Sequence, residues 1–230
     1  MSTARYAVYF APPAASPLWR FGSAVIGYDA ESGQDVPAPP LRRFEAARWR
    51  NITSEPRRYG FHGTLKAPFR LAQGRTEDEL RAACARFAGE RTRFACAGVS
   101  VSAISRFIAL KLASNCAALD RLAAGAVAAF DAFRAPMNEA EREKRLRAPL
   151  TPRQRDHLDR WGYPYVLEDF RFHMTLTGPL EDDERALALA ELEEVFAASG
   201  SDGPLIVPEI ALYRQETGAF RLIARYPLGS

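Results

Sequence analysis

An internal repeat constrains this chain more than any other feature of its sequence. Residues 61–68 read F-H-G-T-L-K-A-P and residues 172–179 read F-H-M-T-L-T-G-P, so five of the eight positions agree at an offset of 111 residues. Each copy is followed by an acidic helix start, an amphipathic helix and a hairpin of apolar strands. Repetition of both the motif and the order of elements predicts an internal duplication, in which two halves pack together.

Each copy of the motif alternates polar and apolar residues, as a strand does when one of its faces is buried. The first copy places His62, Thr64 and Lys66 on one face, and the second places His173 and Thr175 on the corresponding face. The apolar residues between them must face a core, so each half presents one imidazole and one hydroxyl on its other side. A two-fold arrangement of the halves would bring both pairs to a single cleft.

Two imidazoles and two hydroxyls in one cleft suit a reaction at a phosphate ester. An unperturbed imidazole pKa of about 6.5 lets His62 and His173 act as acid and base near neutral pH. The hydroxyls of Thr64 and Thr175 can donate hydrogen bonds to the phosphate oxygens. No group of His, Asp or Glu residues with metal-ligand spacing accompanies either histidine, so we expect neither a metal nor a cofactor.

Three further residues are candidates for substrate binding. Lys66 and Arg171 lie by alternation on the motif-bearing faces, where they could hold phosphate or remain solvated charges at strand ends. Tyr59 stands at the entrance to the first motif, where it could stack on a substrate, although its strand parity favours core packing. His157, the third histidine, has no partner pattern and is expected at the surface of a short helix.

The rest of the chain predicts helices and strands around the two motifs. Alternating apolar residues predict strands over residues 5–11, 59–71, 94–103, 106–113, 171–180, 205–213 and 219–226. Capping residues and helical periodicity predict helices from residue 17 and over residues 76–88, 115–133, 151–162 and 182–198. Phe107 and Phe220 occupy similar places in the closing hairpins of the two halves and are expected in the core.

The length of the chain and the positions of the repeats predict a single two-lobed domain over residues 1–230. The first repeat lies near residues 57–113 and the second near residues 163–228, with a charged helical insert at about 136–162 ahead of the second motif. The cysteines are odd in number and lack paired spacing, so we expect them to be buried, reduced thiols. They are Cys84, Cys96 and Cys116.

The composition limits the partners of the protein. Its 31 basic and 28 acidic residues leave a formal net charge of +3, which argues against long nucleic acid as a partner. The sequence contains no run of about 18 apolar residues, so we expect no membrane span, and its first residues lack the pattern of a signal peptide. We therefore expect a cytoplasmic protein that acts on a small phosphorylated substrate.

The paired His-x-Thr motifs resemble those of the two-histidine (2H) phosphoesterase superfamily, and the order of elements extends the resemblance over nearly the whole chain. Within that superfamily, the segment R-R-Y-G-F-H-G-T-L-K-A-P-F at residues 57–69 is similar to an uncharacterised bacterial branch associated with phosphonate-utilisation operons. The resemblance implies an α+β fold with two lobes related by a pseudo-two-fold duplication, in which two antiparallel sheets flank a central cleft and helices lie on the outside. By analogy, His173 would activate the attacking water and His62 would protonate the leaving oxygen, although the pseudo-symmetry allows these roles to exchange.

The repeat and the resemblance together predict a metal-independent phosphodiesterase of phosphonate metabolism. Its substrate would be a small cyclic phosphate, such as a 2′,3′- or 1,2-cyclic phosphate of ribose or of a nucleotide. Two alternatives stay open. An RNA-end processing enzyme would make long contacts through a basic stripe, which the low net charge does not favour. A nucleotide-binding protein without catalysis would keep the cleft, but no residue of either motif is missing.

Overall fold

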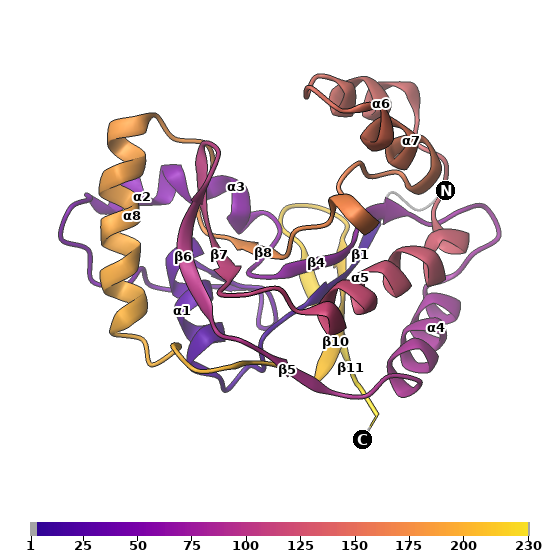
Figure 1. Cartoon of the computed structure of the whole chain (residues 1–230), viewed down its shortest axis with the longest axis horizontal. Coiled ribbons are helices and arrows are strands. Elements are labelled where there is room, and N and C mark those ends of the chain that lie inside the picture. The colour runs from indigo at the N-terminus through magenta and orange to yellow at the C-terminus, as the bar shows by residue number, and fades with distance from the viewer. Residues whose placement is uncertain (1–3, 230) are drawn as a thin grey trace.

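The computed structural model describes residues 4–229, and Figure 1 shows two main sheets with helices on their outer sides. The strands are β1 Arg5–Phe10, β2 Tyr28–Asp29, β3 Gln34–Asp35, β4 Gly63–Arg70, β5 Phe94–Cys96, β6 Val99–Ile104, β7 Phe107–Leu112, β8 His173–Thr175, β9 Leu205–Val207, β10 Glu209–Gln215 and β11 Arg221–Pro227. The larger sheet has the order β11-β10-β1-β4 and the smaller has β6-β7-β8, with antiparallel pairing in both. Two short ribbons pair β2 with β3 and β5 with β9.

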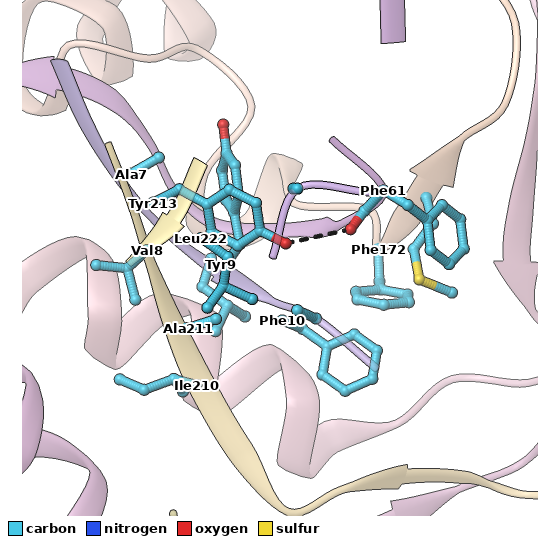
Figure 2. Packing of buried hydrophobic residues seen from close by; sticks show 14 of the residues in the cluster. Ala7, Val8, Tyr9, Phe10, Phe61, Phe172, Ile210, Ala211, Tyr213 and Leu222 are labelled. Atoms are coloured by element: carbon cyan, nitrogen blue, oxygen red, sulfur yellow. Dashed lines mark hydrogen bonds between the residues drawn. The ribbon is translucent and has the colours of Figure 1, made fainter. Parts of the chain in front are cut away.

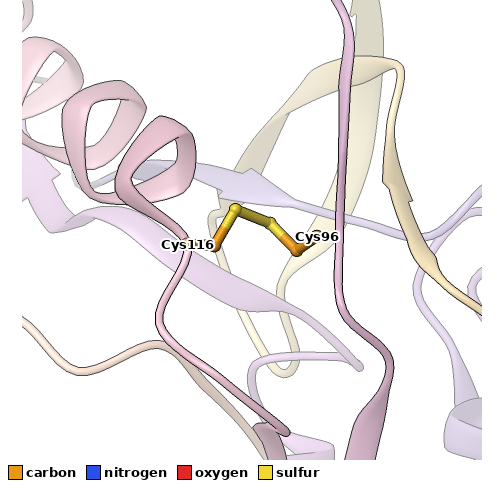
Figure 3. The surroundings of a disulfide bond; sticks show 2 residues. All are labelled: Cys96 and Cys116. Atoms are coloured by element: carbon orange, nitrogen blue, oxygen red, sulfur yellow. A yellow bond between two sulfur atoms is a disulfide. The ribbon is translucent and has the colours of Figure 1, made fainter.

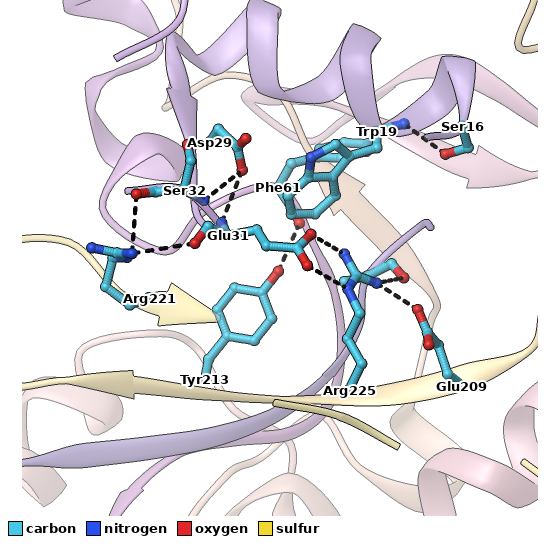
Figure 4. A network of polar contacts seen from close by, with 11 residues as sticks. Ser16, Trp19, Asp29, Glu31, Ser32, Phe61, Glu209, Tyr213, Arg221 and Arg225 are labelled. Atoms are coloured by element: carbon cyan, nitrogen blue, oxygen red, sulfur yellow. Dashed lines mark hydrogen bonds and ion pairs between the residues drawn. The ribbon is translucent and has the colours of Figure 1, made fainter. Parts of the chain in front are cut away.

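The predicted helices lie within a few residues of their expected bounds, whereas the two short helices between residues 46 and 57 were not predicted. They are α1 Pro17–Ile26, α2 Ala46–Ile52, α3 Ser54–Arg57, α4 Glu77–Gly89, α5 Ala117–Ala129, α6 Glu139–Leu146, α7 Pro152–Trp161 and α8 Asp182–Ala197, with 3-10 turns at 131–133 and 167–169. The side chain of Ser16 accepts a hydrogen bond from the backbone of Trp19 (Figure 4), and Thr76 and Thr151 each open a helix with a capping box. These side chains satisfy amides that the first helical turn leaves without partners. The predicted α+β fold, with antiparallel sheets and outer helices, is confirmed.

The hairpin that follows each sequence motif lies in the sheet that contains the other motif. Strands β6 and β7 follow the first motif but belong to the sheet of β8, the strand of the second motif, in which β7 pairs with β8. Strands β10 and β11 join the sheet of β1 and β4. Helix α4 packs against β10 and β11, and α8 packs against β6 and β7. Each lobe is therefore built from both repeats. The equivalence of the lobes is not strict, because β1 separates β10 from β4 whereas β7 pairs with β8 directly.

The two motif strands are shorter than the alternation predicts. The chain turns at Gly60, which has a positive φ of 75°, and β4 begins only at Gly63. Strand β8 ends at Thr175, and beyond it the Thr177 hydroxyl accepts a hydrogen bond from the backbone nitrogen of Ile108 at 3.0 Å. A side chain thus occupies a position in the ladder that a backbone carbonyl would fill in a longer strand.

A disulfide bond joins Cys96, at the end of β5, to Cys116, which precedes the first residue of α5 (Figure 3). Their Cα atoms are 5.7 Å apart and their separation along the sequence is 20 residues, so the bond closes the loop that contains the hairpin of β6 and β7. The prediction of three reduced thiols is wrong for this pair. The sequence spacing does not reveal it, because β5 leaves the predicted hairpin to pair with β9. Cys84 is free and buried, and burial raises the pKa of its thiol to about 12.

The loop that carries β2 and β3 is fixed to the larger sheet by arginines of β11. The guanidinium of Arg225 contacts the carboxylates of Glu31 at 2.9 Å and Glu209 at 2.6 Å (Figure 4). Arg221 donates hydrogen bonds to the carbonyls of Glu31 and Ser32. These contacts fix the polar segment over residues 29–35 to the larger sheet.

Three of the remaining predictions concern burial. Phe220 is fully buried, as expected, but Phe107 is half-buried, so the prediction of a core position for Phe107 is wrong. His157 is 9% exposed, and the prediction that it lies at the surface is also wrong, because α7 packs this ring beside the carboxylates of Glu168 and Asp169. No helix among residues 4–229 is long and apolar enough to span a membrane.

Candidate active site

The two motif strands come together at Gly63 and Phe172. A Cβ atom on Gly63 would lie 2.3 Å from a ring carbon of Phe172, so only glycine allows the strands to approach this closely. Phe172 packs beside Phe10 with 6.0 Å between ring centroids, and Phe61 is fully buried nearby (Figure 2). The apolar face of each motif therefore enters one shared core, as the alternation predicts. The neighbouring histidines of the two motifs are brought to the same region.

The ring of His62 is held by the turn that precedes β4. Its Nδ1 atom lies 2.8 Å from the carbonyl oxygen of Gly60, and its Nε2 atom lies 3.2 Å from the hydroxyl of Thr64. Gly60 adopts a positive φ that a residue with a side chain rarely takes, so this glycine sets the direction of the carbonyl. One polar contact on each nitrogen thus fixes the ring.

The ring of His173 is held by the same local arrangement in the second motif. Its Nδ1 atom lies 2.8 Å from the carbonyl oxygen of Arg171, again the residue two positions earlier. Strand β7 lies beside it, with Lys111 directly across from His173 and Ala109 across from Thr175. The ring of Phe107 is 5.8 Å from that of His173.

Both histidines present the same nitrogen for chemistry. A carbonyl oxygen can only accept a hydrogen bond, so the Nδ1 atoms of His62 and His173 must carry the hydrogen. In a neutral imidazole the Nε2 atom is then the acceptor, and the Thr64 hydroxyl donates to it in His62. Each half therefore offers an oriented Nε2 atom that can take up or release a proton.

The two imidazoles differ in their electrostatic surroundings. Burial lowers the pKa of His62 to about 4, and a positive charge on His173 contributes to the lowering. The hydrogen bond to Gly60 acts in the opposite direction but does not offset the burial. His62 is consequently neutral at pH 7.

A cavity of about 530 Å³ opens beside the second motif. Thr64 and His173 line it, whereas His62 and Thr175 are not among its lining residues. Most of the wall is apolar, and aromatic side chains supply much of it: Phe107, Tyr163, Tyr165, Phe170 and Phe172. A small ligand with an apolar or planar part fits such a wall, with its polar end at Thr64 and His173.

The charged insert forms two helices that stand apart from the sheets, and the chain returning from it builds one side of the cavity. Figure 1 shows α6 and α7 beyond the larger sheet. Arg70 of β4 pairs with Glu141 of α6, and Arg134 donates to the carbonyl of Arg160 in α7 at 2.9 Å. The segment 163–171 follows α7, and all of its residues except Pro164 and Glu168 line the cavity. The insert thus positions the segment that limits the size of a bound ligand.

Lys66 does not line this cavity. Its ammonium is buried, lies 2.9 Å from the carboxylate of Asp131, and donates to the carbonyl of Val127 at 3.0 Å. Burial lowers the pKa of Lys66, and the contact with Asp131 opposes that lowering. Asp131 also pairs with Arg134 at 2.9 Å. Lys66 therefore ties β4 to the end of α5 in this structure.

The other two candidate substrate-binding residues lie close to the histidines. The ring of Tyr59 is 6.3 Å from that of His62 and stacks on Phe220 with 5.6 Å between centroids. Arg171 is exposed and lines the cavity beside His173. Tyr59 lies in the turn ahead of β4 and not in a strand, and its ring packs against the core residue Phe220 on the way to His62.

Several residues of the site carry no signal in the sequence that would single them out. Lys111 and Phe107 reach His173 only because β7 pairs with β8, a contact between different repeats. Tyr9 stacks on His62 because β1 lies beside β4. Among residues 4–229, no three His, Cys, Asp or Glu side chains are grouped so that they could hold a metal ion.

The chain is similar to longer proteins of known name. A ribose 1,5-bisphosphate phosphokinase PhnN from Janthinobacterium sp. (strain Marseille) is 36% identical over 218 residues, which are 94% of this chain and 48% of that protein. A protein of the same name from Laribacter hongkongensis (strain HLHK9) is 38% identical over 224 residues, or 95% of this chain and 50% of that protein. The chain spans about half the length of these curated relatives.

The similarity of this chain to solved structures is weaker than its similarity to these relatives. E. coli LigT complexed with 3′-AMP matches with a TM-score of 0.42 and 14% identity over 99% of both chains. A phosphoesterase crystal structure matches with a TM-score of 0.43 and 13% identity over 98% of both chains. A likeness of this size is too low to assign a function.

A family model described as a protein of unknown function, DUF1045, matches residues 64–221. The match starts at Thr64 of the first motif and includes the whole of the second. It covers more than half of the chain, and the protein therefore belongs to the DUF1045 family.

Proposed function

We propose that this protein is a metal-independent phosphodiesterase that hydrolyses a cyclic phosphate of ribose or of a ribonucleoside. The observation that supports this most directly is the matching geometry of the two histidines. Each Nδ1–H donates to the carbonyl two residues earlier, at 2.8 Å in both motifs, and leaves Nε2 for the substrate. Orientation by a backbone acceptor is what a general acid or base requires, because it fixes which nitrogen exchanges the proton.

In the proposed reaction His62 is the general base and His173 the general acid. His62 is neutral at pH 7, so its Nε2 atom can take a proton from the attacking water. The water oxygen bonds to phosphorus, the bond between phosphorus and one ring oxygen breaks, and His173 gives that ring oxygen a proton. These roles are the reverse of those that the superfamily resemblance implies, and the low pKa of His62 is the reason for the exchange.

The threonines are proposed to bind the phosphate in this reaction. Thr64 donates to His62 and can turn the same hydroxyl to a nonbridging phosphate oxygen. Thr175 occupies the matching position two residues after His173. Donors placed where negative charge develops stabilise the transition state more than the ground state.

The longer relatives support a ribose phosphate as the substrate class. By name they act on ribose 1,5-bisphosphate as phosphokinases, and this chain corresponds to about half of each. A G-x-x-x-x-G-K-[ST] phosphate loop is absent from its sequence, so we propose that the kinase activity of the relatives belongs to their other half. Opening of a 1,2-cyclic ribose phosphate would yield a ribose phosphate ester of the class that such a kinase uses. A role in phosphonate metabolism, proposed from the superfamily branch, fits this pairing.

A second candidate function follows from the aromatic wall of the cavity. Tyr163, Tyr165 and Phe170 offer ring faces on which a nucleobase could stack. The substrate would then be a nucleoside 2′,3′-cyclic phosphate or the cyclic end of an RNA strand. Ribose alone has no planar group for these rings.

A substrate panel in the presence of EDTA tests both candidates. Phosphorus NMR would follow ribose 1,2-cyclic phosphate, adenosine 2′,3′-cyclic phosphate and an RNA oligonucleotide with a 2′,3′-cyclic end. We expect turnover of at least one of them by the wild type, and loss of that turnover in His62→Ala and His173→Ala. Hydrolysis of none of them, or full activity in either variant, would contradict the proposal.

A further inference from the structure

Two cations flank His173 in the cavity without an acidic partner. Lys111 is exposed, lies directly across from His173 in the ladder of β7 and β8, and lines the same cavity. Residues opposite each other in an antiparallel pair have Cβ atoms about 5 Å apart and project to the same face of the sheet. Arg171 precedes His173 by two residues and also lines the cavity. Among residues 4–229, no carboxylate forms an ion pair with Lys111 or Arg171.

The single carboxylate in the cavity wall is already neutralised. Asp169 accepts hydrogen bonds from Arg153 at 2.8 Å and from Gln154 at 3.2 Å, both on the side of α7. These contacts lower the pKa of Asp169, with the hydrogen bond from Arg153 as the largest cause. The guanidinium of Arg171 donates only to the carbonyls of Glu168 and Phe170, which leaves its charge uncompensated. The lining therefore carries an excess of two positive charges beside the second histidine.

Two additional positive charges are more than the cyclic phosphate requires. A cyclic phosphodiester carries one negative charge, and the two motifs already provide two oriented imidazoles and the hydroxyls of Thr64 and Thr175 for it. Lys111 and Arg171 add two positive charges to these groups. A terminal phosphate monoester carries nearly two negative charges at pH 7 and would balance both.

We propose that Lys111 and Arg171 form a second anion subsite, which binds a terminal phosphate monoester on the substrate. The subsite rests on the proposed function for the position of the cyclic phosphate, and it narrows the substrate to a cyclic phosphodiester that bears a second phosphate on the same sugar. Lys111 and Arg171 are then specificity-determining residues, distinct from the four motif residues that act on the cyclic phosphate.

The test compares substrates with and without the second phosphate. Ribose 1,2-cyclic phosphate and adenosine 2′,3′-cyclic phosphate would each be supplied with a free and with a phosphorylated 5-hydroxyl. In the wild type, kcat/KM should favour the phosphorylated form of at least one pair by roughly ten- to a hundredfold, the effect of charge-assisted hydrogen bonds. The preference should fall severalfold in Lys111→Met and in Arg171→Met, and to about one in the double variant.

Lys144→Met is the matched control. Lys144 is exposed on α6 and does not line the cavity, so this variant should keep the wild-type preference. Equal rates for both forms in the wild type, or an undiminished preference in the double variant, would overturn the subsite. If no substrate is turned over, the proposed function fails, and the subsite is decided separately by calorimetric dissociation constants for the same pairs. Equal affinities for the phosphorylated and unphosphorylated forms would then refute it.

Discussion

The ring of Tyr9 lies almost parallel to the ring of His62, with 3.7 Å between their centroids and 21° between their planes. Tyr9 is itself 1% exposed and stands opposite Thr64 in the register of β1 and β4. The phenol ring therefore covers one face of the imidazole and keeps water from it. Burial keeps His62 uncharged at neutral pH, and the hydrogen bond to Gly60 orients its ring.

The low pKa of His62 predicts activity well below neutral pH. Because the base must be neutral, kcat/KM should hold as the pH falls from 7 to 5 and should decline with a midpoint near 4, rather than near 6.5. A pH profile of kcat/KM, together with an NMR titration of the His62 ring, measures both midpoints. An acid limb near pH 6.5 that follows the titration of His62 would show that burial does not lower its pKa.

The same shift predicts how stability depends on pH. The folded protein takes up a proton at His62 only near pH 4, whereas the unfolded chain does so near 6.5. The unfolded state therefore binds more protons between these values, and the free energy of unfolding should fall as the pH falls through this window, with a slope of up to about 1.4 kcal/mol per pH unit. Urea unfolding of the wild type and of His62→Gln at pH 7 and pH 5 tests this, since the variant should lose that part of the dependence.

Removal of either motif imidazole should slow turnover without unfolding the protein. His62→Gln and His173→Gln are each expected to lose about 10²- to 10⁴-fold in kcat, the usual contribution of one positioned acid or base. His157→Gln is the matched control, because this third histidine lies on α7 outside the two motifs. Comparable losses in all three variants would point to a general structural effect instead.

The two motif hydroxyls should contribute less than the imidazoles. Thr64→Val and Thr175→Val keep the shape of the side chain and remove a donor to the phosphate, so each should lower kcat by roughly 10- to 100-fold. Thr92→Val, at an exposed threonine outside both motif strands, should leave the rate unchanged. Unaltered rates in both motif variants would remove the threonines from the phosphate site.

The buried ion pair of Lys66 should respond unequally to loss of its two partners. Asp131→Asn leaves a buried ammonium without its carboxylate and should lower the free energy of unfolding by about 3–5 kcal/mol. Lys66→Met removes the buried charge itself, while Asp131 keeps Arg134, so its cost should be smaller, about 1–2 kcal/mol. Denaturant unfolding of both variants shows which one loses more of its free energy of unfolding. If Lys66 instead binds substrate, Lys66→Met would reduce the kcat/KM of the folded enzyme.

The disulfide should stabilise the smaller sheet. Closing a loop of this length contributes about 3 kcal/mol in the chain-entropy view, so reduction of Cys96–Cys116 should lower the unfolding temperature by several degrees. The double variant Cys96→Ser with Cys116→Ser provides the control, since a reducing agent should leave its unfolding temperature unchanged. Equal unfolding temperatures for the oxidised and reduced wild type would contradict this expectation.

Local chemistry in the sequence predicted much of the fold. The caps at Ser16, Thr76 and Thr151 act through hydrogen bonds within one helical turn, so residue type and spacing suffice to place them. The motif alternation likewise placed Phe61 and Phe172 in the core. Both kinds of prediction depend only on neighbours along the chain.

The features that the sequence did not reveal depend on which distant strands pair. Alternation put Lys66 on the face of Thr64, but irregular register between β1 and β4 interrupts the alternation, and Lys66 is buried under α5. The pairing of β7 with β8 brings Lys111 to His173, and the pairing of β5 with β9 leaves Cys96 near Cys116. No pattern within a single segment specifies such partners.

The exchange of hairpins has a consequence for how the site forms during folding. If the backbone were cut at about residue 148, between α6 and α7, the first fragment would hold β4 without β10 and β11, and the second would hold β8 without β6 and β7. Neither fragment could complete a sheet alone. His62 and His173 should therefore become ordered in one cooperative transition of the whole chain, and the isolated fragments should recover a working site only when they are mixed and associate.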